Sequence, residues 1–81
     1  MKVYAITASY AKDGITTFSR SEGVASTLEE TIRFCEAYIN NEVSPKFSSR
    51  WVAQNDYAGI LTKGSNWTMS YQAFEVDRFT L

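Results

Sequence analysis

The chain has 81 residues, with eight basic and nine acidic side chains, and so lacks the excess of Lys and Arg that is typical of nucleic-acid-binding proteins. A single cysteine, Cys35, excludes an intrachain disulfide, and the absence of histidine excludes histidine-based catalytic triads and argues against a zinc site. The stretch after Met1 and Lys2 is too polar for a secretory signal, and no apolar run approaches the roughly 20 residues that span a bilayer. We therefore expect a single cytoplasmic domain over residues 1–81 that has no contact with a membrane.

Residues 2–21 predict a β-hairpin. β-Branched and aromatic residues are frequent along 2–10, and an Asp-Gly dipeptide then separates this run from a second one over 15–21. Asp-Gly between two such runs is a strong signal for a tight hairpin turn, because both turn residues need a positive φ. Gly23 follows, and we expect it to end the second strand.

The sequence from about 27 to 41 predicts an α-helix. Ser26 precedes Glu29 by three residues, and Thr27 precedes Glu30 by three, so either pair can form a capping box. An apolar stripe recurs at helical spacing, formed by Leu28, Ile32, Cys35 and Ile39. We expect this stripe to pack against side chains of the sheet, namely Tyr4 or Val3, Phe18, Trp67 and Tyr71.

The chain becomes β-like again after Pro45, which cannot continue a helix. Two or three further strands are predicted: 57–62 and 67–74, with 50–54 as a short candidate. The apolar positions change phase near 73–74, which indicates either a β-bulge or the end of the strand. The predicted fold is therefore α+β, a mainly antiparallel sheet of four to five strands with one helix packed across it, in the order ββα followed by β-strands.

The segment "SPKFSSRWV", residues 44–52, interleaves aromatic and basic side chains and permits three interpretations. Phe47 and Trp51 share one side of an extended chain, while Lys46 and Arg50 share the other, as expected of a half-buried strand. The half-buried strand is the favoured interpretation. The second is a protein-binding surface with Trp51 and Arg50 as anchors, because these residue types dominate interface hot spots. A base-stacking platform for nucleic acid is the third, and it needs more cations than the chain supplies.

Few side chains are suited to catalysis, so we do not expect an enzyme, a bound metal or a cofactor. Cys35 lies in the apolar stripe of the predicted helix, without a histidine to form its thiolate, and is expected to be structural. Glu75 and Asp77 share a side of an extended chain and form the competing hypothesis of a carboxylate-based hydrolase or a metal site. A solvated strand end explains them equally well.

The layout resembles small phage-encoded or prophage-encoded accessory proteins that act by binding one host protein. The resemblance covers the opening "MKVYAITASY" strand, the capped helix after a hairpin, and the aromatic "YQAFEVDRF" strand. It implies a non-enzymatic module that inhibits or modulates a host factor in the host cytoplasm. The residues expected to make the contact are Phe47, Arg50, Trp51, Tyr57 and Arg78. The alternative is a small-ligand or nucleotide-binding or sequestering module that uses the aromatic residues and Arg20, Arg50 or Arg78.

Apolar residues on both sides of the strands predict a homodimer. A single helix covers only one side of the sheet, and the other would expose more contiguous apolar surface than monomers usually tolerate. Phe47 and Trp51 are expected at the rim of a two-fold contact, and replacing Trp51 with a charged residue should split it. The alternative is that the chain after residue 44 folds back over the second side.

Overall fold

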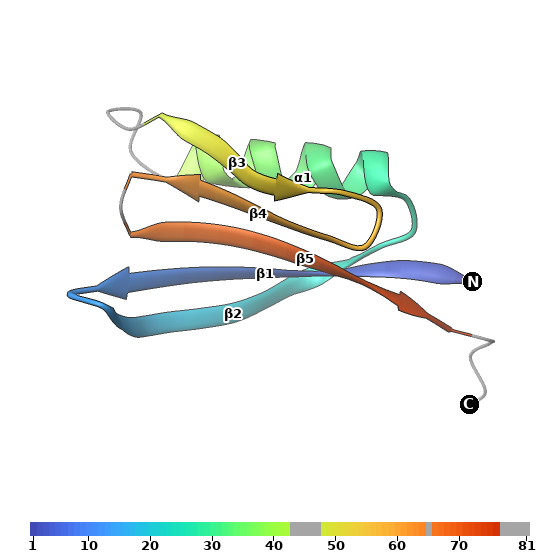
Figure 1. The fold of residues 1–81 in the computed structure, drawn as a ribbon, viewed down its shortest axis with the longest axis horizontal. Helices are drawn as coiled ribbons and strands as arrows, with labels where there is room; N and C mark the ends of the chain where they lie inside the picture. Colours follow the sequence, from blue (N-terminus) through green and yellow to red (C-terminus); the bar gives the residue numbers. More distant parts are fainter. Residues whose placement is uncertain (43–47, 65, 77–81) are drawn as a thin grey trace.

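A five-stranded antiparallel sheet with one helix along one side forms the fold in the computed structural model, which describes residues 1–42, 48–64 and 66–76 (Figure 1). The elements in chain order are β1 (Lys2–Lys12), β2 (Ile15–Ala25), α1 (Leu28–Glu42), β3 (Ser49–Gln54), β4 (Ala58–Lys63) and β5 (Trp67–Glu75). The strand order in the sheet is β2-β1-β5-β4-β3, and every neighbouring pair is antiparallel. The predicted α+β class, with one helix across an antiparallel sheet, is confirmed. None of the described helices is both long and apolar enough to cross a membrane.

The β1–β2 hairpin turns at Asp13 and Gly14, as the sequence predicts. Their φ angles are 55° and 77°, the positive values that a two-residue hairpin turn requires. The predicted end of the second strand is wrong, because Gly23 lies within β2 and pairs with Ile6. The register shifts between Ile6 and Thr7, and Gly23 has a φ of 137°, so this glycine accommodates a bulge and the strand continues beyond it.

The helix begins with Thr27 as its N-cap residue. The backbone N–H of Glu30 donates to Thr27 Oγ1 at 3.1 Å, which satisfies one of the free donors of the first turn. Ser26 Oγ donates to the Glu30 carboxylate at 3.4 Å, so the second candidate residue supports the same cap. Of the two registers that the sequence permits, Thr27 with Glu30 is therefore the one the structure adopts.

The core lies between α1 and the sheet. Its buried members are Tyr4, Ile6, Ala8, Cys35, Ile39, Leu61, Met69 and Tyr71. The expected packing is only partly right, since Val3 lies on the opposite side of the sheet and Phe18 is 36% exposed. Ile32 is only partly buried, whereas Thr31 is fully buried. Thr31 can be buried because its hydroxyl donates to Thr27 O at 2.8 Å, so no polar atom is left unpaired.

The last turn of α1 is joined to the sheet by a buried lysine. Lys63 is buried on β4, and its ammonium donates to Asn40 Oδ1 at 3.3 Å. Ser49 Oγ on β3 donates to the same oxygen at 3.5 Å. A cation near the helix C-terminus also interacts favourably with the helix dipole. Asn40 therefore connects the helix to two strands.

The phase change near residues 73–74 marks no bulge. β5 pairs with β1 without interruption, from Tyr10 opposite Trp67 to Lys2 opposite Glu75, and the strand ends at Glu75. Trp67, Met69, Tyr71 and Ala73 share the helix side, as predicted. Phe74 instead lies on the other side of the sheet. The change of phase therefore arises because Phe74 is an apolar side chain on the side of the sheet without a helix.

Tyr71 lies over Gly59 on the neighbouring strand. A Cβ atom at Gly59 would come within 2.1 Å of Tyr71 Cε2, so any larger residue would force the ring to shift. The Tyr71 hydroxyl reaches past β4 and donates to Asn55 O at 2.6 Å, in the turn between β3 and β4. The rings of Tyr4 and Trp51 meet the Tyr71 ring edge-on, each with a centroid distance of 5.9 Å. Gly59 thus lets one aromatic side chain join β1, β3 and β5.

We predict that Gly59→Ala lowers the free energy of unfolding by about 1–3 kcal/mol, because the new methyl group overlaps the Tyr71 ring. Urea unfolding followed by tryptophan fluorescence measures the change. The matched control repeats the substitution in a Tyr71→Leu background, where the ring is absent and the added cost should be much smaller. Equal costs in both backgrounds would contradict the predicted overlap.

Candidate protein-interaction surface

The side of the sheet opposite α1, called the open face below, is wide and almost uncharged. Its residues are identified by their pairing and by alternation with the buried positions. They are Val3, Ala5, Thr7 and Ser9 on β1; Ser19, Ser21 and Val24 on β2; Thr68, Ser70, Gln72 and Phe74 on β5; Ala58, Ile60 and Thr62 on β4; and Arg50 and Ala53 on β3. Within the described residues these positions include no Asp, Glu or Lys. The single charge, Arg50, lies on an edge strand.

The second half of the chain widens the sheet. β3 and β4 continue the sheet beyond β5, so the described residues after 47 lie in the same layer as β1 (Figure 1). In the described parts of the chain, the expected alternative that this half folds back over the second side is therefore not seen. The open face has no layer of described residues above it.

Phe74 is the most prominent apolar side chain of the central strands on the open face. It is 47% exposed, although it lies on a strand that pairs on both sides. A hollow of about 330 Å³ lies beside it, lined on the sheet by small and polar residues and by Ile60. The short side chains of Ala5 and Ala58 leave this hollow open on the sheet surface. The open face therefore combines a protruding ring with an adjacent depression.

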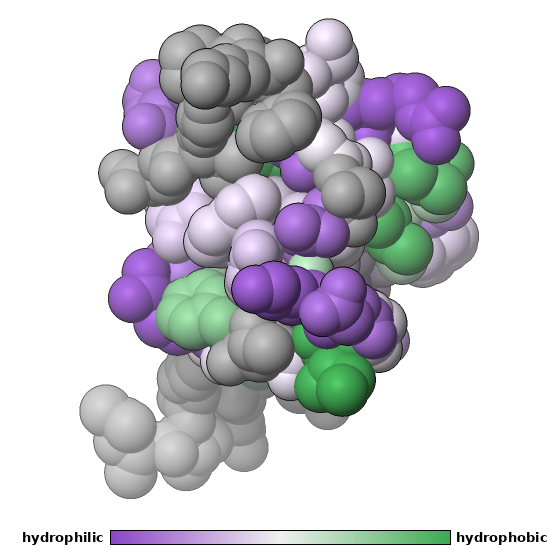
Figure 2. Space-filling view, turned by 90° about the vertical axis from the view of Figure 1, so that its left-hand side faces the viewer, coloured by the Kyte–Doolittle hydropathy of each residue, from purple (hydrophilic) through white to green (hydrophobic). Residues whose placement is uncertain are grey.

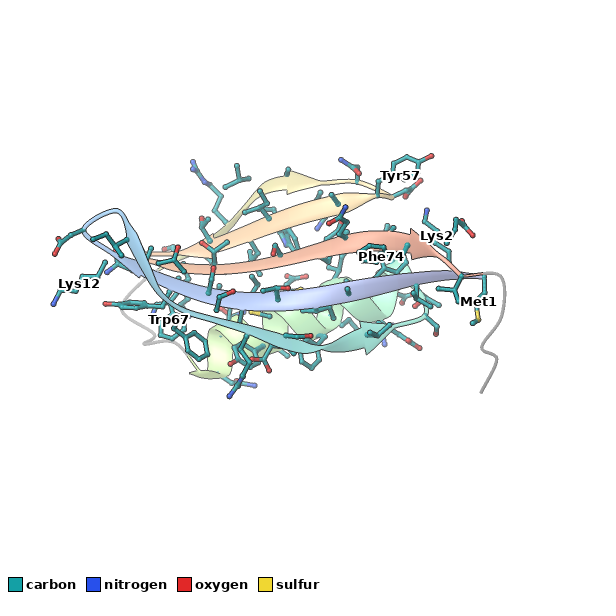
Figure 3. All side chains as sticks on the ribbon, turned by 90° about the horizontal axis from the view of Figure 1, so that it is seen from below. Met1, Lys2, Lys12, Tyr57, Trp67 and Phe74 are labelled. Atoms are coloured by element: carbon teal, nitrogen blue, oxygen red, sulfur yellow. The ribbon has the colours of Figure 1, made fainter. Side chains whose placement is uncertain are left out.

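A second, smaller hollow of about 70 Å³ lies on the other side of Phe74, toward Lys2 and Tyr57. Tyr57 is 73% exposed, and the Lys2 ammonium lies 4.7 Å from the centre of its ring. Figure 3 shows these three side chains at the same end of the sheet as Met1. Asn55 positions Tyr57, because its side-chain oxygen accepts the backbone N–H of Tyr57 at 2.8 Å. Exposed aromatic rings thus cluster at this end.

At the opposite end of the sheet the aromatic side chains pack against one another. Lys12 and the β1–β2 turn lie there, and Trp67 packs against Tyr10 with a centroid distance of 4.9 Å (Figure 3). Figure 2 views the molecule from this end and shows hydrophilic side chains mixed with small apolar patches. The aromatic end with Phe74 and Tyr57 is therefore the stronger candidate for a contact with another molecule.

The residues predicted to make the contact are not brought together. Trp51 is half-buried on the helix side against Tyr71, whereas Arg50 lies on the open face, which is the arrangement of a half-buried strand. Trp51 therefore packs against the core on the side that α1 covers, and its expected place at the rim of a two-fold contact stays a prediction. Tyr57 is exposed in the β3–β4 turn. Phe47 and Arg78 lie outside the described residues.

Sequence reasoning counts Phe74 among the apolar residues of the uncovered side of the sheet but does not select it as an anchor of the contact. The signal was the change of phase at 73–74, which places an aromatic side chain opposite the helix-facing residues of the same strand. From the sequence alone, this change of phase indicates either a bulge or the end of the strand. Because the register with β1 is unbroken, the change of phase instead places Phe74 on the open face.

Arg20, proposed for a ligand site, is held by neighbouring side chains. Its Nε donates to Glu22 Oε1 at 2.7 Å and its Nη2 to Tyr38 OH at 3.2 Å, and Tyr38 OH donates to Glu22 Oε1 at 3.2 Å. The hydrogen bond and charge of Glu22 raise the pKa of Arg20. Arg20 lies on β2 and Arg50 on β3, which are the two opposite edges of the sheet. These two arginines therefore do not form one anion site.

Cys35 is fully buried between α1 and the sheet. Burial, reinforced by the charge of Glu36, raises the pKa of its thiol to about 11. The thiol is therefore protonated at neutral pH and lacks the thiolate character of a nucleophile.

Glu75, one of the two carboxylates of the competing hydrolase hypothesis, forms an ion pair with the N-terminus. Its Oε2 lies 3.7 Å from the Met1 ammonium, which also donates to Val76 O at 2.7 Å. Asp77, the other carboxylate, lies outside the described residues. Within the described part of the chain, no group of three His, Cys, Asp or Glu residues is arranged to hold a metal ion.

Comparison with known proteins found no matching family model, no matching curated protein and no matching solved structure.

We predict that the stability of the protein falls as the pH rises from 9.0 to about 11. The unfolded thiol of Cys35 ionises from about 9.0, whereas the folded one resists ionisation up to about 11, so the stabilisation is complete below pH 9.0 and is lost above it. The loss is on the order of 2 kcal/mol. Cys35→Ala should be less stable at neutral pH but should show a flatter dependence over this interval in urea unfolding. Burial also raises the pKa of Tyr38, and this shift contributes equally in both proteins. The pKa of Tyr71 is raised by burial and also by Cys35, so removing the thiol reduces the contribution of Tyr71 as well and flattens the profile of the variant further. Parallel pH profiles for the two proteins would contradict this role for the thiol.

Proposed function

We propose that the protein is a non-enzymatic protein-binding module that contacts its partner through the open face, with Phe74 as the central anchor. The observation that carries the proposal is the position of Phe74, an exposed ring beside a hollow on a wide and almost uncharged sheet surface. Aromatic anchors surrounded by polar contacts are the usual energetic centres of protein interfaces. The hydroxyl groups of the open face supply adaptable hydrogen bonds around this anchor.

The chemistry of the open face favours a protein over a nucleotide or a nucleic acid. Phosphate groups need converging cations or a cluster of backbone N–H groups. Among the described residues, the open face has only Arg50, at its edge, and Arg20 is engaged with Glu22 on the other side of the sheet. A polypeptide surface needs no such charge.

The edges of the sheet are less suited to a partner strand than the open face. β2 contains two register shifts against β1, and β3 contains one next to Val52. Bulges of this kind twist an edge strand away from further pairing, and natural sheets use them to prevent it. The contact is therefore assigned to the side chains of the open face.

The proposed partner is a host protein that the module inhibits or modulates, which is what the resemblance to phage accessory proteins implies. Covering a functional surface of the partner is sufficient for inhibition. Such an action requires no catalytic group on this chain.

We predict that Phe74→Ala abolishes capture of the partner from bacterial lysate, because truncating an aromatic anchor typically costs about 2 kcal/mol or more. Phe34→Ala is the matched control, since Phe34 is 39% exposed on α1, on the opposite side of the molecule. Quantitative mass spectrometry compares the proteins retained by immobilised wild type and by both variants. A retained protein lost only with Phe74→Ala supports the proposal. Equal retention by all three would refute it, and native mass spectrometry of a co-purifying small molecule would support the ligand-binding alternative.

We predict that Glu75→Gln and Asp77→Asn leave this capture unchanged. Glu75 is 77% exposed in its side chain, and its ion pair with the N-terminus contributes at most about 1 kcal/mol of stability. Binding through the open face does not use its charge. A metal-dependent activity that either substitution removes would support the hydrolase hypothesis instead.

A further inference from the structure

We propose that the open face also binds a second copy of this chain, with Phe74 of each copy inserted into the hollow beside Phe74 of the other. The inference rests on the proposed function, since it uses the same surface, and it names one occupant of that surface. The second copy is expected from the sequence. The structure supplies a specific contact that differs from the one expected at Phe47 and Trp51.

The charge of the open face suits a second copy. Two identical faces brought together by a two-fold axis bring like charges near each other, and burying unpaired charge is costly. The described residues of β1, β4 and β5 place no charged side chain on this face, and Arg50 lies at the edge, where water can solvate it. The open face is therefore electrostatically compatible with itself.

The shape of the open face is also compatible with itself. The ring of Phe74 protrudes, and the hollow of about 330 Å³ lies next to it on the same side of the sheet. Sites of about 300 Å³ and more hold organic groups of the size of an aromatic ring. In an isologous contact, a ring that enters the partner's hollow is matched by the partner's ring in its own. One pair of features on one chain thus makes two equivalent insertions.

The area of the open face indicates the size class of the expected interface. Strands about 4.8 Å apart, with a rise of about 3.4 Å per residue, give this sheet a footprint of roughly 500–600 Å². Two copies therefore bury on the order of 1,100 Å², which is at the lower end for a specific interface. Interfaces at this end of the size range are commonly weak and transient, so a reversible dimer is expected.

Self-association has a consequence for the proposed function. A dimer covers the surface that a host protein would bind, so the two contacts compete. The monomer is then the active form, and dilution of the module should increase partner binding per molecule.

Light scattering coupled to size exclusion tests the dimer between low and high micromolar concentration. The wild type should rise from a mass near 9.2 kDa toward about twice that value. Phe74→Glu should remain monomeric, whereas the matched control Phe34→Glu should dimerise as the wild type does. Ile60→Lys, at the wall of the hollow, is a second interface variant in case Phe74→Glu fails to fold, which circular dichroism would reveal. A wild type that stays monomeric at every concentration overturns the inference, and so does a folded Phe74→Glu that still dimerises.

A mixture of Phe74→Glu and Phe74→Lys tests whether opposite charges at position 74 restore the dimer. Each variant alone repels its own copy, whereas the mixture places opposite charges in the two hollows and should restore the dimer in part. The capture experiment separates the inference from the proposed function. A monomeric wild type with Phe74-dependent capture overturns the dimer alone. A dimer that depends on Phe74, without any Phe74-dependent capture, supports the dimer and overturns binding of a host protein.

Discussion

The contact between the Tyr71 ring and the backbone of Gly59 is the constraint on which the rest of the structure depends. Because Gly59 has no side chain, the ring crosses β4, and its hydroxyl bonds to the carbonyl oxygen of Asn55 in the next turn. Trp51 then packs on the same ring, so the β3–β4 hairpin is held against the centre of the sheet. A small domain buries only a modest share of its surface, so its core is small. Here one aromatic side chain is enough to join the edge hairpin to that core.

A single helix on a five-stranded sheet leaves one side without a covering layer, and the composition of the chain reflects this. The strands place large apolar residues toward α1, and mainly hydroxyl-bearing and small residues on the open face. Ser and Thr side chains tolerate water while remaining compatible with a strand. Val3, Ile60 and Phe74 are the larger apolar residues on the central strands, and Ile60 and Phe74 are adjacent to the same hollow. Where a surface is otherwise polar and small, such exceptions indicate a contact with another molecule.

Local signals predicted most of the elements, and the failures share a cause. The turn at Asp13 and the cap at Thr27 depend on residues close in sequence, so the local pattern was sufficient to find them. Gly23 was misread because a glycine in a strand can end it or accommodate a bulge, and only the pairing with Ile6 distinguishes the two. Thr31 was overlooked as a core residue because its burial depends on a hydrogen bond within the helix together with the approach of the sheet. Lys63 was overlooked in the same way, since its partner is 23 residues distant in the sequence.

The sequence by itself determined the class of fold, the helix with its cap and the separation of Trp51 from Arg50 to opposite sides of a strand, because periodicity and capping are local properties. It also indicated, through the phase change at 73–74, that an aromatic residue leaves the helix-facing side. Only the tertiary structure decided what that change means. The order of strands places β5 between β1 and β4, and this places Phe74 beside Ala5, Ala58 and Ile60. A surface made by three separate strands exists only once their neighbours are chosen, and strand order is a property of long-range pairing that no local pattern in this chain specifies.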